Sequence, residues 1–431
     1  MNTPYKIWLV RWKHYFEKMV GSNEMRVVFV NLHSDWMLVK AASVYIFKFS
    51  AAIKHGYLLK YLLEHPEYEV CNYINDRGFS TLRNDNEVLM KALNNFRFLE
   101  NKMTMNVNGI DSKNITILKN ASEIRPDDLV ILYNICSDNY RGMSGVDAFK
   151  ALSMLHFHGR AEEDEIIKKA NVSCLFGEVD LQKNCELYRR YYHIDKPWVT
   201  HPFVYAERFK NKVPFKKRKN MAFATGTITY KTHKEFLDTY GDSCDQPSRK
   251  QIKDNPEYFK DTIYCTSSDY LEDNAGKTVK SNDSPLIKIY KKVYNRLFTG
   301  KQKKYYSFDM VEAFNSYKMC VVGEEILGIP GIGFVEGMAC GCAYLGVDSP
   351  AYRDWGLIPG VHFIAYDGSK EDLRAKIEYY QKDENQEELE KIANTGCEYV
   401  RTHFNGEVVA EKLMHDLIEQ QKIWFTQKEE K

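Results

Sequence analysis

Short apolar runs that alternate with longer helical stretches constrain this chain most. Runs of four to six apolar residues suit strands that are buried on both faces, as in a parallel sheet. Helical patterns separate most of the runs, and His65-Pro66 ends one predicted helix over residues 43–64. The alternation predicts a doubly wound α/β domain. The runs are Met25–Val30, Glu69–Ile74, Ile115–Leu118, Leu129–Asn134, Leu152–Phe157 and Val172–Phe176.

A second series of the same kind begins after residue 220. Its predicted strands are Met221–Thr225, Met319–Gly323, Ala343–Val347 and His362–Ala365. Predicted helices follow over 369–381, 386–402 and 406–425, and the last carries Val409, Leu413 and Leu417 at four-residue spacing. The fold class expected is therefore α/β, with two Rossmann-like doubly wound domains that face a cleft.

The region around residues 195–220 interrupts the alternation and predicts an interdomain connection. Its segment 208–219 holds seven basic residues and no acidic residue, which is typical of a solvated linker and also suits a contact with phosphate or an anionic membrane. We expect five parts along the chain. An N-terminal amphipathic extension (1–24) precedes a first domain (25–200), and a linker (201–220) leads to a second domain (221–405). A C-terminal helix (406–431) then crosses back to the first domain.

Composition excludes several classes of protein. Lys and Arg number 60 against 59 Asp and Glu, so the net charge of +1 argues against a general polyanion binder, and we expect no nucleic-acid partner. The sequence contains no run of about 18 apolar residues, so we expect no membrane-spanning helix. Arg11 and Lys13 interrupt the first apolar run, so we expect no signal peptide. The ten cysteines form no CxxC pair, which indicates reduced thiols in a cytoplasmic protein.

The N-terminal residues 1–20 intermix Trp8, Trp12 and other apolar residues with Lys and Arg. Two interpretations are open. One is a helix packed on its own domain or on a neighbouring subunit, and the other is an amphipathic segment that makes a peripheral contact with a membrane.

The segment Met319–Gly346 is the most informative for function. A predicted strand ends in Gly323, and Glu324 and Glu325 follow it. Gly331 and Gly333 then precede a short predicted helix that contains Glu336. Glycines allow backbone N–H groups to approach a phosphate, and a carboxylate nearby can accept hydrogen bonds from ribose hydroxyls. Two interpretations are open: a nucleotide site, or a tight strand–loop–helix turn whose packing requires the glycines.

The sequence FVEGMACGCAYLG within this segment resembles the C-terminal signature of nucleotide-sugar glycosyltransferases of the GT-B fold. In these group 1 glycosyltransferases a glycine loop precedes E-A-M-A-x-G and a strand, and residues 336–341 match that order. The stretch 360–376, the run 392–396 and the segment 201–209 resemble later and interdomain parts of the same family. The resemblance extends over about 195–420 and is architectural over 25–190.

The resemblance implies a set of donor-binding residues. Glu336 would hold the ribose, while Lys231 and Arg249 would neutralise the diphosphate. Arg249 lies in a Pro-Ser-Arg sequence that resembles a CgeB-like branch of the family. The donor-binding residues expected are Gly226, Thr227, Lys231, Arg249, Glu324, Glu325, Gly331, Gly333, Phe334 and Glu336.

This chain departs from the family pattern at two places. Retaining members carry a first Glu where this sequence has Gly328, and the family's G-R-x-x-x-x-K motif is represented only by Gly226 to Lys231, without the Arg. These departures leave open whether the sugar transfer would retain or invert the configuration at the anomeric carbon. The chain contains no DxD triplet, which metal-dependent transferases of another fold use, so we expect no metal and no other cofactor.

Six first-domain residues are candidates for the acceptor side. His156 and His158 follow a predicted strand and alternate onto one face, so either could act as the catalytic base toward an acceptor hydroxyl. His33 and Asp35 follow the first strand. Glu178 and Asp180 offer an alternative base after the strand at 172–176.

The function expected is transfer of a sugar from a UDP- or GDP-sugar to a hydroxyl of a glycan or lipid-linked acceptor, without a metal. The partners are thus a nucleotide-sugar and a glycan or glycolipid. One alternative is a CMP-sugar donor, suggested by His201-Pro202. The other is an inactive scaffold of the same fold in a polysaccharide assembly complex, suggested by Gly328 and the missing Arg.

Overall fold

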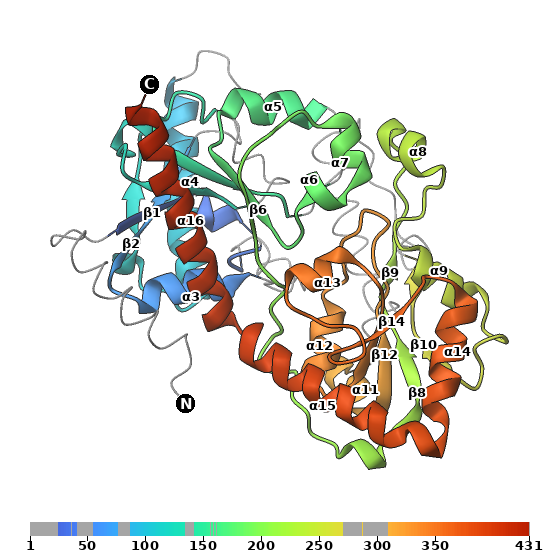
Figure 1. Ribbon diagram of the computed structural model, residues 1–431. Helices are drawn as coiled ribbons and strands as arrows, with labels where there is room; N and C mark the ends of the chain where they lie inside the picture. Colours follow the sequence, from blue (N-terminus) through green and yellow to red (C-terminus); the bar gives the residue numbers. More distant parts are fainter. Residues whose placement is uncertain are drawn as a thin grey trace.

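The computed structural model describes residues 25–35, 37–40, 55–75, 87–133, 142–155, 157, 159–160, 162–269, 287 and 309–430. The side chains of 87–96, 162 and 166 lie outside this description. Two lobes, each built on a parallel sheet, lie side by side, and the C-terminal helix runs over the lobe formed by the first half of the chain (Figure 1).

A seven-stranded parallel sheet forms the first domain, with the order β3-β2-β1-β4-β5-β6-β7. The order reverses between β1 and β4, as in dinucleotide-binding sheets. Its strands are β1 (Met25–Val30), β2 (Tyr68–Tyr73), β3 (Thr116–Leu118), β4 (Leu129–Leu132), β5 (Phe149–Ser153), β6 (Cys174–Gly177) and β7 (Trp198–Thr200). Its helices are α3 (Gly56–Glu64), α4 (Glu87–Val107), α5 (Glu162–Ala170), α6 (Leu181–Asn184) and α7 (Glu186–Tyr191).

A five-stranded parallel sheet forms the second domain, with the order β10-β8-β12-β13-β14 and a reversal between β8 and β12. Its strands are β8 (Lys219–Ala224), β10 (Ile263–Cys265), β12 (Tyr317–Val321), β13 (Ala343–Val347) and β14 (Ile364–Tyr366), and β9 (Thr227–Ile228) pairs with β11 (Ser268–Asp269) beside it. Its helices are α8 (Lys234–Tyr240), α9 (Pro247–Asp254), α11 (Met310–Ser316), α12 (Gly333–Ala339), α13 (Pro350–Asp354), α14 (Lys370–Gln381) and α15 (Gln386–His403).

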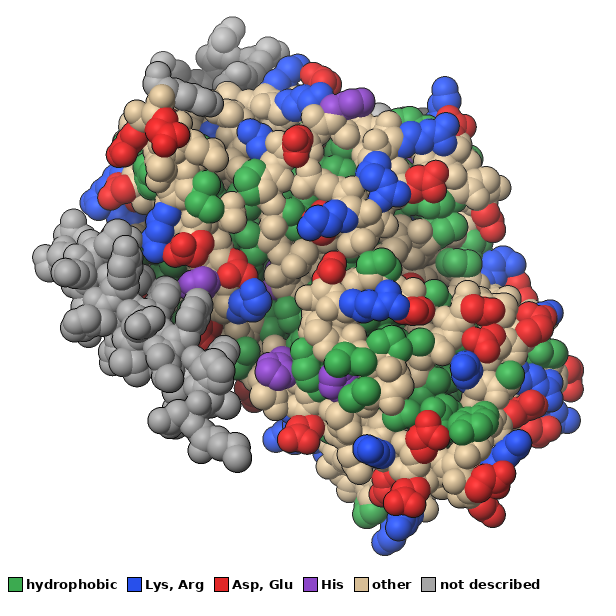
Figure 2. Space-filling view, viewed as in Figure 1, with side chains coloured by type: hydrophobic (Ala, Val, Ile, Leu, Met, Phe, Trp, Pro, Cys, Tyr) green, Lys and Arg blue, Asp and Glu red, His purple; other side chains and the backbone are tan. Residues whose placement is uncertain are grey.

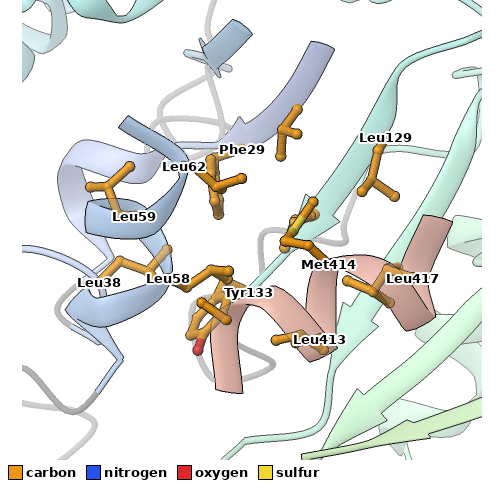
Figure 3. Packing of buried hydrophobic residues seen from close by; sticks show 14 of the residues in the cluster. Phe29, Leu38, Leu58, Leu59, Leu62, Leu129, Tyr133, Leu413, Met414 and Leu417 are labelled. Carbon is orange, nitrogen blue, oxygen red and sulfur yellow. The ribbon is translucent and has the colours of Figure 1, made fainter. Parts of the chain in front are cut away.

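Helix α16 (Gly406–Glu429) belongs in sequence to the end of the chain and in space to the first domain. The Asn405 side chain caps it by accepting a hydrogen bond from the Val408 N–H at 3.1 Å. Leu413, Met414 and Leu417 pack into the core that also contains Phe29 and Leu129 (Figure 3). The chain therefore leaves the second domain through α15 and buries its last helix against the first.

The predicted fold class is confirmed: both sheets are parallel and doubly wound, with helices on both faces. Strands β7, β9, β10 and β11 were not predicted, because they are two or three residues long and carry no clear apolar pattern. The predicted helix over 43–64 is described only from residue 55 onward, and α3 occupies its last nine residues.

The strand predicted at 152–157 is wrong in its position, because β5 ends at Ser153. The misleading residue is Lys150, which interrupts the apolar run and is nevertheless only 1% exposed. Its ammonium group donates to the carbonyls of Met143 at 3.1 Å and Val146 at 2.7 Å, so the polar end of the side chain is satisfied inside the protein. Burial lowers the pKa of Lys150. A hydrogen-bonded lysine inside a strand cannot be recognised from local periodicity.

The two domains are packed against each other through their loops. The Trp355 indole N–H of the second domain donates to the Glu178 carbonyl of the first at 3.0 Å. Leu327 and Phe236 of the second domain belong to a core cluster that is otherwise made of first-domain residues. Phe203 lies edge-on to the Phe334 and Trp355 rings, at centroid distances of 6.2 and 5.8 Å. This packing fixes the walls of the space between the domains.

The surface carries both signs of charge. On the face seen in Figure 2, Lys and Arg side chains are interspersed with Asp and Glu among the described residues. Within the same part of the chain, no helix combines the length and the hydrophobicity that a membrane span requires. All nine described cysteines are free thiols.

Gly337 provides a test of the packing around α12. A methyl group at this position would lie 2.5 Å from Cys320 Sγ and 3.1 Å from the Phe314 ring. Gly337→Ala normally gains up to about 1 kcal/mol of helix propensity. We expect the clash to outweigh that gain, so the variant should lose about 1–3 kcal/mol of unfolding free energy in urea denaturation.

The double variant Gly337→Ala/Cys320→Ala supplies the control, because removing the sulfur removes the clash. We expect the second substitution to cost less in the Gly337→Ala background than in the parent. Additive effects of the two substitutions would contradict this account of the packing.

Candidate active site between the two domains

A cavity of about 630 Å³ lies between the domains, at the carboxyl ends of strands from both sheets. Ligands of open α/β sheets bind at this edge, where the strand order reverses. The second domain contributes the segments after β8 and β12, including Thr225–Lys231 and Ile329–Gly333. The first domain contributes Phe157, Glu178 and other residues after β5 and β6. We call this cavity the central cleft.

Arg249 lies in the wall of the central cleft, and no salt bridge to a described carboxylate compensates its positive charge. It lies on α9, which begins at Pro247, and its guanidinium donates to three backbone carbonyls. Nε donates to Val322 at 2.6 Å, Nη1 to Thr227 at 2.8 Å and Nη2 to Gly323 at 3.2 Å. Within the described part of the chain, Arg249 has no carboxylate partner. The side chain thus connects the loop after β8 to the end of β12 through hydrogen bonds. These carbonyl acceptors are neutral and do not offset its positive charge.

Glycines make room for this arginine. A Cβ atom at Gly226, whose φ is +133°, would lie 2.7 Å from Arg249 Cζ. A Cβ atom at Gly331 would overlap Arg249 Nη2, and one at Gly323 would lie 3.0 Å from Arg249 Cγ. Gly333 instead faces Val322, where a Cβ atom would lie 3.1 Å from Cγ1. Gly226 and Gly331, two of the expected donor-binding glycines, therefore approach Arg249 closely, whereas Gly333 packs against Val322.

Lys231 also lines the central cleft, but its charge is paired. Its ammonium lies 3.1 Å from Asp245 Oδ2, and the Lys231 side chain is 14% exposed. Asp245 further accepts hydrogen bonds from Thr229 Oγ1 at 3.3 Å and from Gln246 Nε2 at 3.1 Å. The sequence singled out Lys231 and gave no signal for Asp245, which lies 14 residues further along the chain.

Helix α12 separates two of the expected donor residues. Glu336 lies in its first turn and lines the central cleft. Phe334 is fully buried on the opposite side, where its ring stacks on Trp355 at a centroid distance of 5.7 Å. The Phe334 side chain is therefore part of the core and does not line the cleft.

The adjacent acids Glu324 and Glu325 also separate. Glu324 is 7% exposed, and its Oε1 accepts hydrogen bonds from the Tyr352 hydroxyl at 2.6 Å, the Val347 N–H at 2.9 Å and the Tyr344 hydroxyl at 3.1 Å. Burial raises the pKa of Glu324. Glu325 lines the central cleft, whereas Glu324 does not. Sequence alone could not distinguish two neighbouring glutamates at the end of one strand.

Besides the two alternative acids, the structure describes only His33 and Asp35 among the first-domain candidates. His156 and His158 lie outside the described residues. His33 and Asp35 are buried at the carboxyl end of β1 and do not line the central cleft. Asp35 accepts a hydrogen bond from the Met37 N–H at 3.0 Å. Burial and, to a smaller degree, the charge of Arg97 lower the pKa of His33 to about 4.

Of the two alternative acids, Asp180 caps α6 and lies 3.0 Å from the ammonium of Lys183. Glu178 lines the central cleft, and its Oε1 lies 3.5 Å from Nε2 of His55. His55 is 3% exposed, also lines the cleft and lies beside Tyr133 at a ring distance of 5.5 Å. His55 was not predicted as a site residue, because the predicted helix over 43–64 placed it inside a helix. In the structure it is the residue that precedes α3.

The central cleft thus combines a guanidinium without a described carboxylate partner on one wall with a histidine–glutamate pair on the other. Such a site suits an anionic leaving group and proton transfer from a hydroxyl. Within the described ranges, no group of three or more His, Cys, Asp or Glu side chains is arranged to hold a metal ion.

Buried histidines predict how stability depends on pH. Burial lowers the pKa of His201 to about 4, against 6.5 for an ordinary histidine, and Nδ1 lies 3.2 Å from the Pro202 carbonyl. The unfolded chain therefore binds more protons than the folded chain between these values, so stability falls on acidification through this range, by up to about 1.4 kcal/mol per pH unit for each such group.

We expect urea denaturation at pH 7, 6 and 5 to give a declining unfolding free energy, and His201→Gln to reduce the decline. His193, whose side chain is 73% exposed, supplies the control, because His193→Gln should leave the slope nearly unchanged. A slope that does not change in His201→Gln would contradict the assignment of a neutral buried imidazole.

Several solved structures are similar to the chain over most of its length. Sucrose-phosphate synthase of Thermosynechococcus elongatus has 12% identity and a TM-score of 0.47, covering 92% of this chain and 98% of the other. Anabaena HepE, solved with UDP and glucose, has 10% identity and a TM-score of 0.48, covering 92% and 100%. A glycosyltransferase from Rickettsia africae has 11% identity and a TM-score of 0.45, covering 93% and 99%. No curated protein is similar to the chain in sequence.

A family model supplies the link to an enzyme class. Residues 277–415 match the family described as glycosyl transferase-like. The described part of this segment contains the loop after β12, helix α12 with Glu336, and the helices α14 and α15. The expected class, a glycosyltransferase, is confirmed: residues 277–415 carry a glycosyl transferase-like domain.

Proposed function

We propose that the protein transfers a sugar from a nucleoside diphosphate sugar to a hydroxyl of a glycan or lipid-linked acceptor, without a metal ion. The observation that carries this proposal is Arg249. Three of its five N–H groups are used by backbone carbonyls, and no described carboxylate neutralises it. The remaining donors and the full charge suit the negative charge that develops on a departing diphosphate.

The other donor contacts follow from the walls of the central cleft. Glu336 lines the cleft one turn into α12, and its carboxylate suits the two adjacent hydroxyls of a ribose. Lys231 would add a second positive charge if a diphosphate replaced Asp245 as its partner. Gly331 and Gly333 line the cleft without side chains of their own, beside Pro330 and Ile332, which line it too.

The acceptor side of the reaction requires a base. We propose that His55 removes the proton from the acceptor hydroxyl and that Glu178 holds the imidazole and stabilises its protonated form. Both residues line the first-domain wall of the same cleft. His156 and His158, the bases predicted from the sequence, lie outside the described residues, so that prediction stays open.

Finer assignments rest on the sequence resemblance. The Pro247-Ser248-Arg249 sequence favours the CgeB-like branch, and the resemblance favours UDP or GDP as the nucleotide. A cytoplasmic location and a membrane contact through residues 1–20 stay predictions, because residues 1–24 lie outside the described ranges.

Thermal unfolding in the presence of UDP, GDP, CMP, ADP and dTDP, each with and without EDTA, tests the proposal. A nucleotide at about 100 times its Kd adds about 2.7 kcal/mol of stability. We expect UDP or GDP to raise the Tm, and EDTA to leave that shift unchanged. Stabilisation by CMP alone would favour the CMP-sugar alternative, and no stabilisation by any nucleotide would overturn the proposal in favour of the inactive scaffold.

Arg249 is the residue whose removal should weaken the nucleotide most. Arg249→Gln removes a charge that would make charge-assisted hydrogen bonds to the diphosphate. The loss of about 1.5–3 kcal/mol corresponds to a Kd about 10- to 100-fold higher, measured by calorimetry. Arg249→Lys should restore part of the affinity, because it keeps the charge and loses the planar fork.

Lys250→Ala is the matched control for Arg249, because Lys250 is the next residue on α9 and pairs with Asp254 on the surface. Each variant's stability without nucleotide must be measured too, since Arg249 also holds three carbonyl groups. An unchanged nucleotide Kd in Arg249→Gln would refute the assignment of the diphosphate site.

Glu178→Gln tests the proposed base, since it keeps the shape of the side chain and removes the charge beside His55. We expect kcat for release of nucleoside diphosphate from the donor, with alkyl glycosides as acceptors, to fall by about 10- to 1,000-fold. The Kd of the nucleotide should not change. In His55→Gln, kcat should fall by a similar factor. In the double variant, kcat should be little lower than in either single variant, because the two residues act as a unit. A full rate in both single variants would exclude this pair.

A further inference from the structure

A second cavity of about 580 Å³ adjoins the central cleft, on the other side of the start of α9. Helix α9 divides the two spaces: Arg249 lines the central cleft, whereas Ser248 and Gln251 line the second cavity. Glu325 lines both, so the two spaces share a wall. The first domain contributes Asn184 and Arg189 to the second cavity. A ligand there would contact both domains and lie next to the donor.

Two residues that line this cavity, Glu324 and Asn184, each carry a buried polar atom without a hydrogen-bond partner. Glu324 uses Oε1 for the two tyrosine hydroxyls and the Val347 N–H, and its Oε2 is buried without a partner. Asn184 Nδ2 is also buried without a partner. Leaving such groups unpaired costs free energy, so a ligand that donates to the carboxylate or accepts from the amide is favoured.

The chemistry of the walls selects the class of ligand. A carboxyl oxygen and an amide N–H together require a group that both donates and accepts, which a hydroxyl does. Charges of both signs line the cavity, with Lys183 and Arg189 against Glu325 and Asp348. This mixture favours neither a simple anion nor a simple cation. Ser248, Gln251 and Ser349 add further neutral polar groups.

We infer that the second cavity binds a neutral sugar residue of the acceptor, next to the residue whose hydroxyl is glycosylated. The inference rests on the proposed function, because it takes the central cleft as the site of the donor. Arg249 and Glu336 hold the nucleoside diphosphate there, and the shared wall at Glu325 lets one acceptor span both spaces. The acceptor class is thereby narrowed to one that carries at least two sugar residues.

The test uses two cavity variants and one control. Gln251→Trp fills the cavity, and Asn184→Ala removes the unpaired amide without adding bulk. Glu324 is left intact, because its carboxylate also holds Tyr344 and Tyr352. Lys250→Ala on the same helix is the control, since Lys250 does not line the cavity. All variants are first compared in thermal unfolding, so that Asn184→Ala decides the question if Gln251→Trp does not fold.

The probes are the methyl glycosides of glucose, galactose, mannose and N-acetylglucosamine, observed by saturation-transfer NMR with the stabilising nucleotide bound. We expect at least one glycoside to bind the parent and the Lys250→Ala variant. Its binding should be lost in Gln251→Trp and weakened by about 3- to 10-fold in Asn184→Ala, the effect of one neutral hydrogen bond. Equal binding in the parent and both cavity variants, or no binding of any glycoside to the parent, would overturn the inference.

Nucleotide binding separates this inference from the proposed function. If no nucleotide binds the parent, the proposed function is refuted. If the nucleotide binds the parent and the cavity variants bind the glycoside as the parent does, only the assignment of the second cavity is refuted. The donor's own sugar is distinguished by comparing UDP-glucose with UDP. If the cavity variants weaken UDP-glucose and leave UDP unchanged, the cavity holds the sugar of the donor, and the assignment to the acceptor fails.

Discussion

Parallel strands oblige all of their carboxyl ends to meet at one edge of a sheet, and the organisation of this protein depends on that constraint. Each sheet must send its chain back over a face before the next strand, so the loops that follow the strands collect at a single edge. Two such edges face each other here, and residues that follow β5, β6, β8 and β12 line one cavity. The packing of Trp355 on Glu178 and of Leu327 in the first-domain core keeps these edges together.

Arg249 is the clearest example of a side chain that serves both fold and site. Its three hydrogen bonds satisfy carbonyl groups at the end of β12 and after β8, where the strands can no longer pair. Because all three acceptors are neutral carbonyl oxygens, none of them offsets the positive charge of the guanidinium. The close approach of Gly226, Gly323 and Gly331 explains why small residues gather there. A positive charge fixed in this way is preorganised for an anionic ligand.

The residues predicted from the sequence in the second domain mostly line the central cleft, whereas the described residues His33 and Asp35, predicted in the first domain, do not. A glycine-rich loop, Glu336 and Arg249 were found because glycine, carboxylate and arginine patterns carry direct chemical meaning, and the structure lines one cavity with them. Phe334 and Glu324 were equally plausible from the sequence, but both are buried away from that cavity. Which side of a short helix or strand end faces a cleft depends on packing with Trp355, Tyr344 and Tyr352, which lie further along the chain.

Local pattern by itself determined the two α/β domains, the main strands and the last three helices, because burial on both faces and helical periodicity are properties of neighbouring residues. Only the tertiary structure decided the pairs His55–Glu178 and Lys231–Asp245, the burial of Lys150, and the second cavity beside α9. These depend on side chains brought together from distant parts of the chain. The physical reason is that a charge is free, paired or buried only with respect to its neighbours in space, and the sequence lists neighbours along the chain.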